Sequence, residues 1–394
     1  MTKYRVIAGG TLLATALTAT ACGSNDGSES SASTSSTATS STSADSGPPS
    51  GGPGGAGGGM GQTFTAVDLD TEGASAGGAN TAEVVPVVQA FLDSLDAETR
   101  DAVEYDFTDN QSRQTWSNFP TSTVAREGVA LSDLSADQQQ AALAILQTAL
   151  SSDGSTQTDE IRASDDYLNS LGGQGADGFG SLVDYYIAIY GEPSTSAPFM
   201  VQFGGHHLAR NLTYNGDAVS QTPQFVGTEP TTFEVDGTTV EPLAAESDAM
   251  FGMLAGLDAD QLASAEITSG TFDDLVMGPG ADTGVFPEAE GLVVSELPAD
   301  QQALVTAAIE AYVGDLSTEA AAAVMAQYES ELDETTIGWS NNTGPTEENS
   351  YVRIDGPSVW IEFINTRSMS TPDIHFHSVY RDKNNDYGST NVSE

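Results

Sequence analysis

The chain has 394 residues, and its 11 lysines and arginines against 57 aspartates and glutamates give a formal net charge of −46. This balance argues against a nucleic-acid-binding protein, because phosphate contacts need basic patches, and against binding to anionic membrane surfaces. Hydrophobic residues make up 38% of the chain, and the stretch poorest in them lies at the N-terminus, so a folded core can form further on. The acids are spread through that region without like-charged blocks. Their mutual repulsion is screened in strong salt, which favours a salt-loving host.

The N-terminal residues have the features of a targeting segment. Lys3 and Arg5 precede the apolar stretch 6–20, which is shorter than the roughly 20 residues that a membrane-spanning helix needs. Small residues then lead to Cys22, the only cysteine of the chain, in an arrangement that resembles the lipobox of bacterial and archaeal lipoproteins. We expect a signal peptide over residues 1–21 and lipidation at Cys22, which would anchor the protein to the cell membrane, facing outside the cytoplasm.

Residues 22–61 form a segment of unusual composition, dominated by serine, threonine, glycine, proline and alanine. Such a segment cannot bury enough apolar surface to offset the entropy lost on ordering, so we expect a flexible tether. The folded domain would then occupy residues 62–394.

Two pairs of similar segments indicate an internal duplication. Residues 94–98 match residues 256–260, and residues 128–139 match residues 291–302, so the offsets are 162 and 163. Because order and spacing agree, a repeat explains the matches better than a chance similarity of two acidic helices.

Each repeated segment predicts the start of a helix. Ser135 with Gln138 has the pattern of a capping box. Asp258 with Gln261 is a similar pair, and Pro298 would take the first helical position. Apolar residues follow at helical spacing in both copies: Leu143, Leu146 and Leu150 in the first, and Val305, Ile309, Tyr312, Val313 and Leu316 in the second.

After the helices, each half turns to strand-like sequence. Residues 199–214 and 351–364 each have the pattern of two short strands around a glycine-containing turn. We therefore predict an α+β fold in which two internally duplicated halves, each a helical segment followed by short antiparallel strands, pack as one unit. The halves would span about 84–228 and 249–388, with residues 229–248 as the connection.

The four histidines carry whatever chemistry the sequence shows. They fall in two short motifs, Gly205-His206-His207 and His375-Phe376-His377. The second motif lies in residues 374–382, which alternate like a strand, so both of its histidines share one face and can meet one metal ion. His206 and His207 are adjacent, and along a strand only one of them would point the same way.

The histidine motifs have the pattern of a metal site. Three imidazoles from two elements, with an open fourth position, are typical of catalytic zinc, and imidazole also suits copper and iron. We therefore expect a transition metal held by His375, His377 and one of His206 or His207. Glu362 is the carboxylate candidate for a general base, because it ends the strand that answers the first histidine motif in the duplication. A Ser-His-Asp triad is the weaker interpretation, since no Gly-x-Ser-x-Gly elbow is present.

Two further features do not require a ligand. Residues 382–388 begin like a calcium loop, but Tyr387 and Ser393 stand where an EF-hand has glycine and glutamate, so an Asn/Asp-rich turn is the better interpretation. Arg210 and Arg381 are able to clamp an anion, although salt bridges to the abundant acids account for them more simply.

Three stretches of the chain resemble the uncharacterised domain-of-unknown-function family 3500. Residues 204–213 look like its GHHLSLNFT-type motif, residues 356–366 like its GPxxxIEYxNT-type segment, and residues 375–388 like its HIHSVWRDxxNDFG-type end. The resemblance covers about residues 84–388 and implies a shared fold and site, but no reaction. Carried over by motif, the site comprises the metal candidates His206, His207, His375 and His377, the carboxylate Glu362, and the ligand-binding candidates Asn211, Asn365, Arg381 and Asp382.

Two functions of different classes follow. The first is a lipid-anchored metal-binding protein, which as an enzyme would carry out metal-assisted hydrolysis with Glu362 as base. The second is a non-catalytic lipoprotein whose histidine, arginine and asparagine side chains recognise an anionic or sugar-like small molecule without a metal. Ring nitrogens that converge on one point would favour the first function. Histidines hydrogen-bonded one by one to backbone or carboxylates would favour the second.

Overall fold

The structure is a computed structural model that describes residues 66–69, 77–172, 178–368 and 373–389. All of these residues belong to one unit, Pro53–Glu394. The predicted signal peptide, the lipidation site Cys22 and the tether lie outside the described residues. No helix among the described residues combines the length and the apolar character that a membrane span requires.

Helices and strands are both abundant, which confirms the α+β class. The α-helices are α1 (Thr81–Asp93), α2 (Ala97–Val103), α3 (Asn110–Arg113), α4 (Ala136–Ala149), α5 (Ser152–Leu171), α6 (Ala244–Ala255), α7 (Ala259–Ser264), α8 (Ala299–Val313) and α9 (Thr318–Ser330). Short 3-10 turns include η1 (Leu131–Asp133), η3 (Val294–Glu296), η4 (Leu332–Glu334) and η5 (Asp386–Gly388).

The predicted helix starts are found at α4 and α7. Ser135 and Gln138 form a capping box before α4, and Asp258 and Gln261 form one before α7. The prediction that Pro298 takes the first helical position of α8 is wrong. Pro298 has an extended backbone with a ψ of 158°, so it precedes the helix as the N-cap residue.

Most strands join one twelve-stranded sheet. The strands are β1 (Glu104–Tyr105), β2 (Val129–Ala130), β3 (Tyr185–Tyr190), β4 (Phe199–Gly205), β5 (Leu208–Asn215), β6 (Ala218–Ser220), β7 (Gln224–Thr228), β8 (Phe233–Val235), β9 (Thr238–Val240), β10 (Leu292–Val293), β11 (Thr336–Asn341), β12 (Ser350–Asp355), β13 (Val359–Arg367) and β14 (Ile374–Asp382). Their order is β1-β3-β4-β5-β7-β14-β13-β12-β11-β10, with β2 beside β3 and β6 beside β5, and β8 and β9 form a separate hairpin. Every pair in the sheet is antiparallel except β1 with β3.

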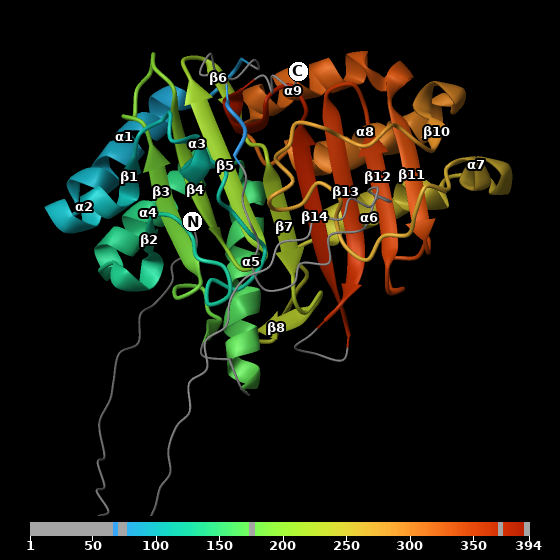
Figure 1. Cartoon of the computed structure of the whole chain (residues 1–394). Coiled ribbons are helices and arrows are strands. Elements are labelled where there is room, and N and C mark those ends of the chain that lie inside the picture. Colours follow the sequence, from blue (N-terminus) through green and yellow to red (C-terminus); the bar gives the residue numbers. More distant parts are fainter. Residues whose placement is uncertain (1–65, 70–76, 173–177, 369–372, 390–394) are drawn as a thin grey trace, which may run out of the picture. The chain divides into compact units, whose positions relative to one another are not determined.

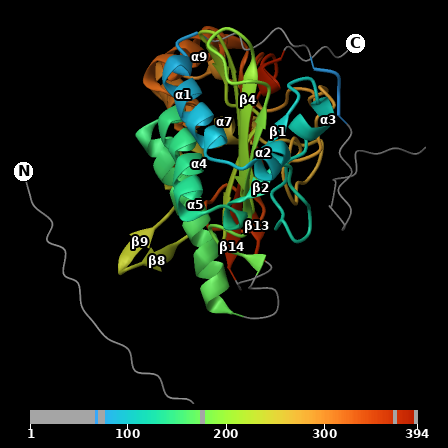
Figure 2. The ribbon, with the colours of Figure 1, turned by 90° about the vertical axis from the view of Figure 1, so that its left-hand side faces the viewer.

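Helices cover one face of the sheet, and irregular segments cover the other. In Figure 2, α1, α4 and α5 lie along one side of the strands, while α3 lies on the opposite side. The helix side holds the larger core, which includes Ile145, Ile309 and Phe203. The other face holds a smaller core that includes Trp116 and Phe225. The sheet is therefore buried on both faces, and side chains on its second face meet loops and the short helix α3 rather than the longer helices.

The order of elements recurs along the chain. The first series is α1, α2, β2, η1, α4, α5, β3, β4, β5 and β7. The second series, α6, α7, β10, η3, α8, α9, β11, β12, β13 and β14, follows the same order. The elements β1, α3 and β6 of the first half have no counterpart in the described part of the second. The two series meet at the centre of the sheet, where β7 pairs with β14 (Figure 1). Gly128 and Gly291, just before β2 and β10, have φ values of 85° and 110°. A Cβ at Gly128 would lie 2.0 Å from the carbonyl oxygen of Ile187, and one at Gly291 would lie 2.2 Å from that of Ile337. The same constraint therefore holds in both halves, while their origin by duplication stays a prediction.

The observed boundaries differ from the predicted ones in three places. The halves begin with α1 at Thr81 and α6 at Ala244, a few residues before their expected starts at about 84 and 249, and the connection contains the hairpin β8–β9. Strands β4 and β5 are joined by a two-residue turn made of His206 and His207. The prediction that these histidines alternate along a strand is therefore wrong. The φ of His207 is 58°, a left-handed value that regular strands do not contain.

Candidate metal centre

Strand β14 places two histidines on the face of the sheet away from the helices. His375 and His377 alternate with Phe376, which packs against the helix-side core. The Nε2 atoms of the two histidines are 3.0 Å apart. Both residues are buried, with exposed fractions of 7% for His375 and 5% for His377. Two nitrogens bound to one zinc ion at about 2.0–2.1 Å would lie roughly 3.3 Å apart in tetrahedral geometry. The pair therefore already has nearly the spacing of two ligands of one ion.

A third histidine comes from the turn between β4 and β5. The backbone N–H of His207 donates to the carbonyl of Asn118 at 3.2 Å, and its own carbonyl accepts from the N–H of Gly227 at 2.8 Å. Gly227 lies on β7 directly opposite His377 on β14, so these bonds bring the turn to the histidine strand. A Cβ at Gly227 would lie 3.1 Å from the His207 ring, so glycine at this position lets the ring approach closely.

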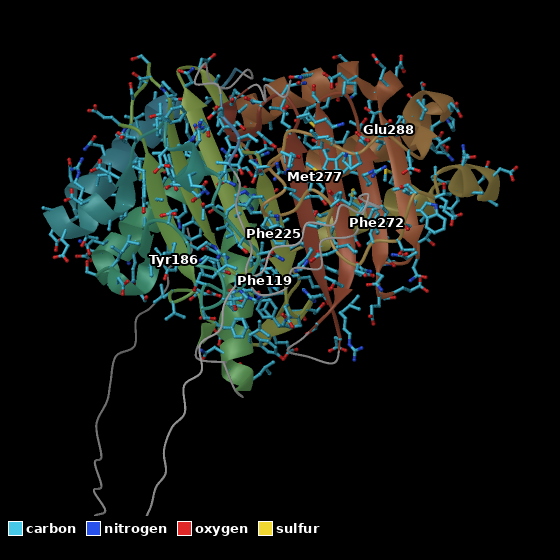
Figure 3. All side chains as sticks on the ribbon, in the orientation of Figure 1. Phe119, Tyr186, Phe225, Phe272, Met277 and Glu288 are labelled. Carbon is cyan, nitrogen blue, oxygen red and sulfur yellow. The ribbon has the colours of Figure 1, made fainter. Side chains whose placement is uncertain are left out.

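The side chains of these three histidines converge. One ligand atom from each of His207, His375 and His377 lies within 4.8 Å of the other two. The ring centre of His207 is 5.2 Å from the ring centres of both others. His206 is outside this set, although its ring centre is 3.8 Å from that of His207. Phe225, labelled near the middle of the sheet in Figure 3, lies beside the cluster with its ring 5.4 Å from that of His377.

Two carboxylates hold the outer histidines. An Oδ1 atom of Asp274 is 2.8 Å from Nδ1 of His377, and one of Asp165 is 2.7 Å from Nδ1 of His206. A carboxylate on Nδ1 fixes the orientation of the ring and leaves Nε2 for a metal. Asp165 lies on α5 and is fully buried, whereas the side chain of Asp274 is 45% exposed. Sequence reasoning missed both residues, because no pattern distinguishes them among 57 acids.

Burial keeps the two inner histidines neutral. It lowers the pKa of His207 well below the usual value, and the neighbouring histidines lower it further. Burial also lowers the pKa of His375 to about 2, with a further contribution from His377. For His206, burial alone would lower the pKa, but the carboxylate of Asp165 raises it overall. Since a neutral imidazole is the form that binds a metal, the inner rings are ready to act as ligands.

The cluster also contains a polar atom that the protein does not satisfy. Within the described residues, Nδ1 of His207 is buried and has no hydrogen-bond partner. Such an atom costs about 1–3 kcal/mol when nothing compensates it, and a bound ion is one way to compensate it. The donor set, the spacing of the nitrogens and this unsatisfied atom all fit a transition metal.

Glu362, the predicted carboxylate base, is occupied away from the histidines. Its carboxylate accepts the backbone N–H groups of Val276 at 2.5 Å and Met277 at 2.8 Å, and the indole N–H of Trp360 at 2.5 Å. Burial raises its pKa, and the two backbone donors act in the opposite direction. Glu362 thus anchors the segment that crosses the second half of the sheet, where Figure 3 labels Met277. It does not belong to either described group of potential ligand atoms, and its role as a base stays a prediction.

The two predicted asparagines bind backbone groups rather than joining the cluster. Asn211 on β5 donates to the carbonyl of Pro223 at 2.7 Å. Asn365 on β13 donates to the carbonyl of Glu347 at 3.0 Å. It lies opposite Phe376 in the register of β13 and β14, and therefore on the helix side of the sheet. Neither amide is directed at the histidines.

The predicted salt bridges of the two arginines are confirmed. Arg381 binds Asp282 through Nη2 at 2.8 Å and Asp386 through Nη1 at 3.1 Å. Arg210 binds Asp315 at 2.5 Å. All of these side chains are buried, so the arginines are consumed by internal ion pairs and are not available to an outside anion.

Asp382 lies at the end of β14 and faces the helices. Its carboxylate accepts the hydroxyl of Tyr328 on α9 at 2.7 Å and the backbone N–H of Asn384 at 2.9 Å. Burial raises its pKa to about 6. The residues that follow form a turn, as the Asn/Asp-rich sequence predicts.

The structure thus combines an α+β fold with a cluster of four buried histidines held by two carboxylates, the buried Asp165 and the half-exposed Asp274. These features define a class of protein with a candidate metal centre built between two halves of one sheet. A family model with the description "Protein of unknown function (DUF3500)" matches residues 77–389, and the chain belongs to this family. No curated protein and no solved structure gives a match. The family description names no activity, so a functional argument must start from the site.

Proposed function

We propose that this protein binds a transition metal ion, zinc, copper or iron, through His207, His375 and His377. The observation that carries this proposal is the convergence of three buried imidazoles whose ligand atoms lie within 4.8 Å of one another. Zinc, copper and iron all accept imidazole ligands, and three histidines leave room for a further ligand. A bound ion would supply Lewis-acid or redox chemistry at this point in the fold.

The surrounding residues support a metal centre in two ways. Asp274 on Nδ1 of His377 orients that ring, as carboxylates do for many metal-bound histidines. The side chain of Asp274 is partly exposed while the histidines themselves are almost fully buried, so the ligand nitrogens are shielded from bulk water.

The alternative, a small-molecule binding site without a metal, has less support. It relies on Arg381, Asn211 and Asn365 as recognition groups, and all three use their donors on the protein itself. The proposal is therefore limited to metal binding. A hydrolytic reaction with Glu362 as base has less support, because that carboxylate is held by backbone N–H groups.

The metal proposal is tested by the metal content of the purified full chain. The protein is prepared in molar salt without chelator or histidine tag, and its metals are counted by mass spectrometry. We expect a near-stoichiometric amount of zinc, copper or iron in the natural chain, and the loss of the ion held by His375 and His377 in the His375→Ala/His377→Ala variant. Phe376→Leu is the matched control, because it changes the residue between the two histidines on the opposite face of β14 and should keep the metal.

Two results would count against the proposal. One is a natural chain that carries no metal and takes up none after reloading with zinc and with copper. The other is a double variant that folds normally by circular dichroism and retains as much metal as the natural chain.

We further infer that the protein is anchored outside the cytoplasm by a lipid on Cys22. The support is the sequence alone, namely the basic start, the short apolar stretch and the small residues before the single cysteine. Mass spectrometry of the N-terminal peptide should show a chain that begins at a lipid-modified Cys22, and Cys22→Ser should move the protein from the membrane fraction to the soluble one. An unmodified Cys22 in a protein recovered from the soluble fraction would refute the proposed lipid anchor without affecting the metal proposal.

A further inference from the structure

His207 belongs to two groups of potential metal ligands. The first group is the set of His207, His375 and His377, and the second is the set of Asp165, His206 and His207. In each group the ligand atoms lie within 4.8 Å of one another. His206 is not a member of the first group, so the four histidines form two overlapping sites rather than one four-histidine site.

The second group is as deeply buried as the first. Asp165 is 0% exposed, His206 4% and His207 2%. Oδ1 of Asp165 is 2.7 Å from Nδ1 of His206, and its other oxygen accepts the hydroxyl of Tyr185 at 2.7 Å. Zinc binds carboxylate oxygen and imidazole nitrogen at similar distances of about 2.0–2.2 Å, which places two such ligands roughly 3 Å apart. The contact between Asp165 and His206 therefore fits two ligands of one cation.

An orienting role does not explain this pair. Asp274 orients His377, which is itself a ligand candidate of the first ion. Asp165 binds His206, which lies outside the first group, so its carboxylate orients no ligand of that ion. The pair is joined to the hydroxyl of Tyr185, which also contacts the carbonyl of His206 at 2.9 Å, and within the described residues it contacts no ligand of the first ion except through His207.

The electrostatic surroundings favour a positive charge at this second position. Asp165, Asp184 and Glu229 all act on His206 as negative charges. One carboxylate oxygen of Asp184 is buried without a hydrogen-bond partner in the described part of the chain. Arg126, whose guanidinium donates to the carbonyl preceding His206 at 2.9 Å, acts on Asp184 as a positive charge. A cation beside His206 would offset the remaining negative charge of Asp165 and Glu229.

We propose that the protein holds two metal ions that share His207, one bound with His375 and His377 and the other bound with Asp165 and His206. The proposal rests on the proposed function, because His207 is a ligand in both positions. A histidine has two ring nitrogens, and each can serve one ion. A neutral imidazole carries one ring proton, so coordination at the second nitrogen releases that proton to solvent. The carboxylate of Asp165 supplies the negative charge of the second site.

The test counts zinc ions bound by the metal-free full chain. Isothermal titration and mass spectrometry after loading should both give two zinc ions per natural chain. Asp165→Asn/His206→Ala should bind one, and His375→Ala/His377→Ala should also bind no more than one. If the double variant fails to fold, the single variant Asp165→Asn, which keeps the size of the side chain, takes its place. It should lower the affinity for the second zinc ion by at least about tenfold.

Glu246→Gln is the matched control. Glu246 is a buried carboxylate of α6 that belongs to neither ligand group and whose charged neighbours are Asp315 and Arg210 rather than the histidines, so the variant should still bind two zinc ions. A natural chain that saturates at one ion, with Asp165→Asn unchanged, overturns this inference and leaves the proposed function in place. A natural chain that binds no zinc overturns both.

Discussion

The two ends of strand β14 hold buried polar clusters that differ in how well they are satisfied. At one end, Arg381 donates to Asp282, to Asp386 and to the carbonyl of Met277, at 2.8, 3.1 and 2.9 Å. At the other end, His375 and His377 meet ring to ring, and the neighbouring His207 has a ring nitrogen without a partner in the described residues. The same strand thus carries one cluster that the protein completes by itself and one that it leaves incomplete.

This difference separates a structural cluster from a candidate functional one. In the arginine cluster, burial alone would lower the pKa of Arg381, but Asp282 and Asp386 raise it above its usual value. Positive charge and hydrogen bonds are therefore matched within the fold. In the histidine cluster, rings held neutral by burial face one another, and neutral rings attract a cation rather than repel it. An incomplete buried cluster is a place where a bound ion could supply the missing contacts, as the proposed function requires.

The largest predicted effect concerns the complete cluster. Arg381→Met should lower the free energy of unfolding by about 3–5 kcal/mol, because it leaves Asp282 and Asp386 buried without their counter-charge. Urea unfolding followed by circular dichroism measures this loss. Arg381→Lys is the control and should lose less, since it keeps the charge while giving up the forked geometry. A loss below about 1 kcal/mol for Arg381→Met would show that the cluster is not structural.

A buried glutamate, Glu246, provides a second test of the contrast between satisfied and unsatisfied buried groups. Glu246 on α6 is buried, and one of its carboxylate oxygens has no partner in the described residues. Burial and then the nearby Asp315 raise its pKa to about 7, while Arg210, which binds Asp315, acts in the opposite direction. Because the pKa is higher in the folded state than the ordinary value of 4.5, the folded protein binds this proton more strongly and loses stability as pH rises from about 4.5 to 7.

Glu246→Gln should therefore stabilise the protein at pH 8 by about 2 kcal/mol and have little effect at pH 4.5, since glutamine stays neutral throughout. Unfolding curves at both pH values measure the difference. The metal content should not change, because Glu246 is outside both ligand groups. Equal effects at the two pH values would mean that the carboxylate is already ionised without penalty in the folded state.

The smallest predicted effect concerns an exposed ion pair, which sharpens the contrast with Arg381. Arg100 binds Glu104 at 2.7 Å and Asp93 at 3.4 Å, and its side chain is 35% exposed. Arg100→Ala should lower the free energy of unfolding by less than about 1 kcal/mol, and by less still in about 2 M salt, where exposed charges are screened. The same salt series on the natural chain tests the expected adaptation to salt, because a net charge of −46 should make it more stable as salt rises. An Arg100→Ala loss as large as that of Arg381→Met would remove the distinction between buried and exposed pairs.

Local sequence patterns were sufficient for a large part of the fold. The capping pairs before α4 and α7 predicted the helix starts, because a cap needs only side chains within one turn. The alternation of residues 374–382 predicted β14 with its bounds and placed His375 and His377 on one face, because side chains alternate along any strand. The same reasoning failed at His206 and His207, where a tight turn replaces the expected strand and the sequence has none of the usual turn residues at the second position.

The sequence by itself determined that the chain is strongly acidic, that it has an α+β fold in two similar series of elements, and that its histidines lie in two motifs. Only the tertiary structure decided that the motifs meet. The pairing of β7 with β14 joins segments about 150 residues apart, and no local pattern encodes such a long-range register. The structure alone also selected Asp165 and Asp274 from the many acids and identified Asp282 and Asp386 as the partners of Arg381, because burial and partner choice depend on which elements pack together.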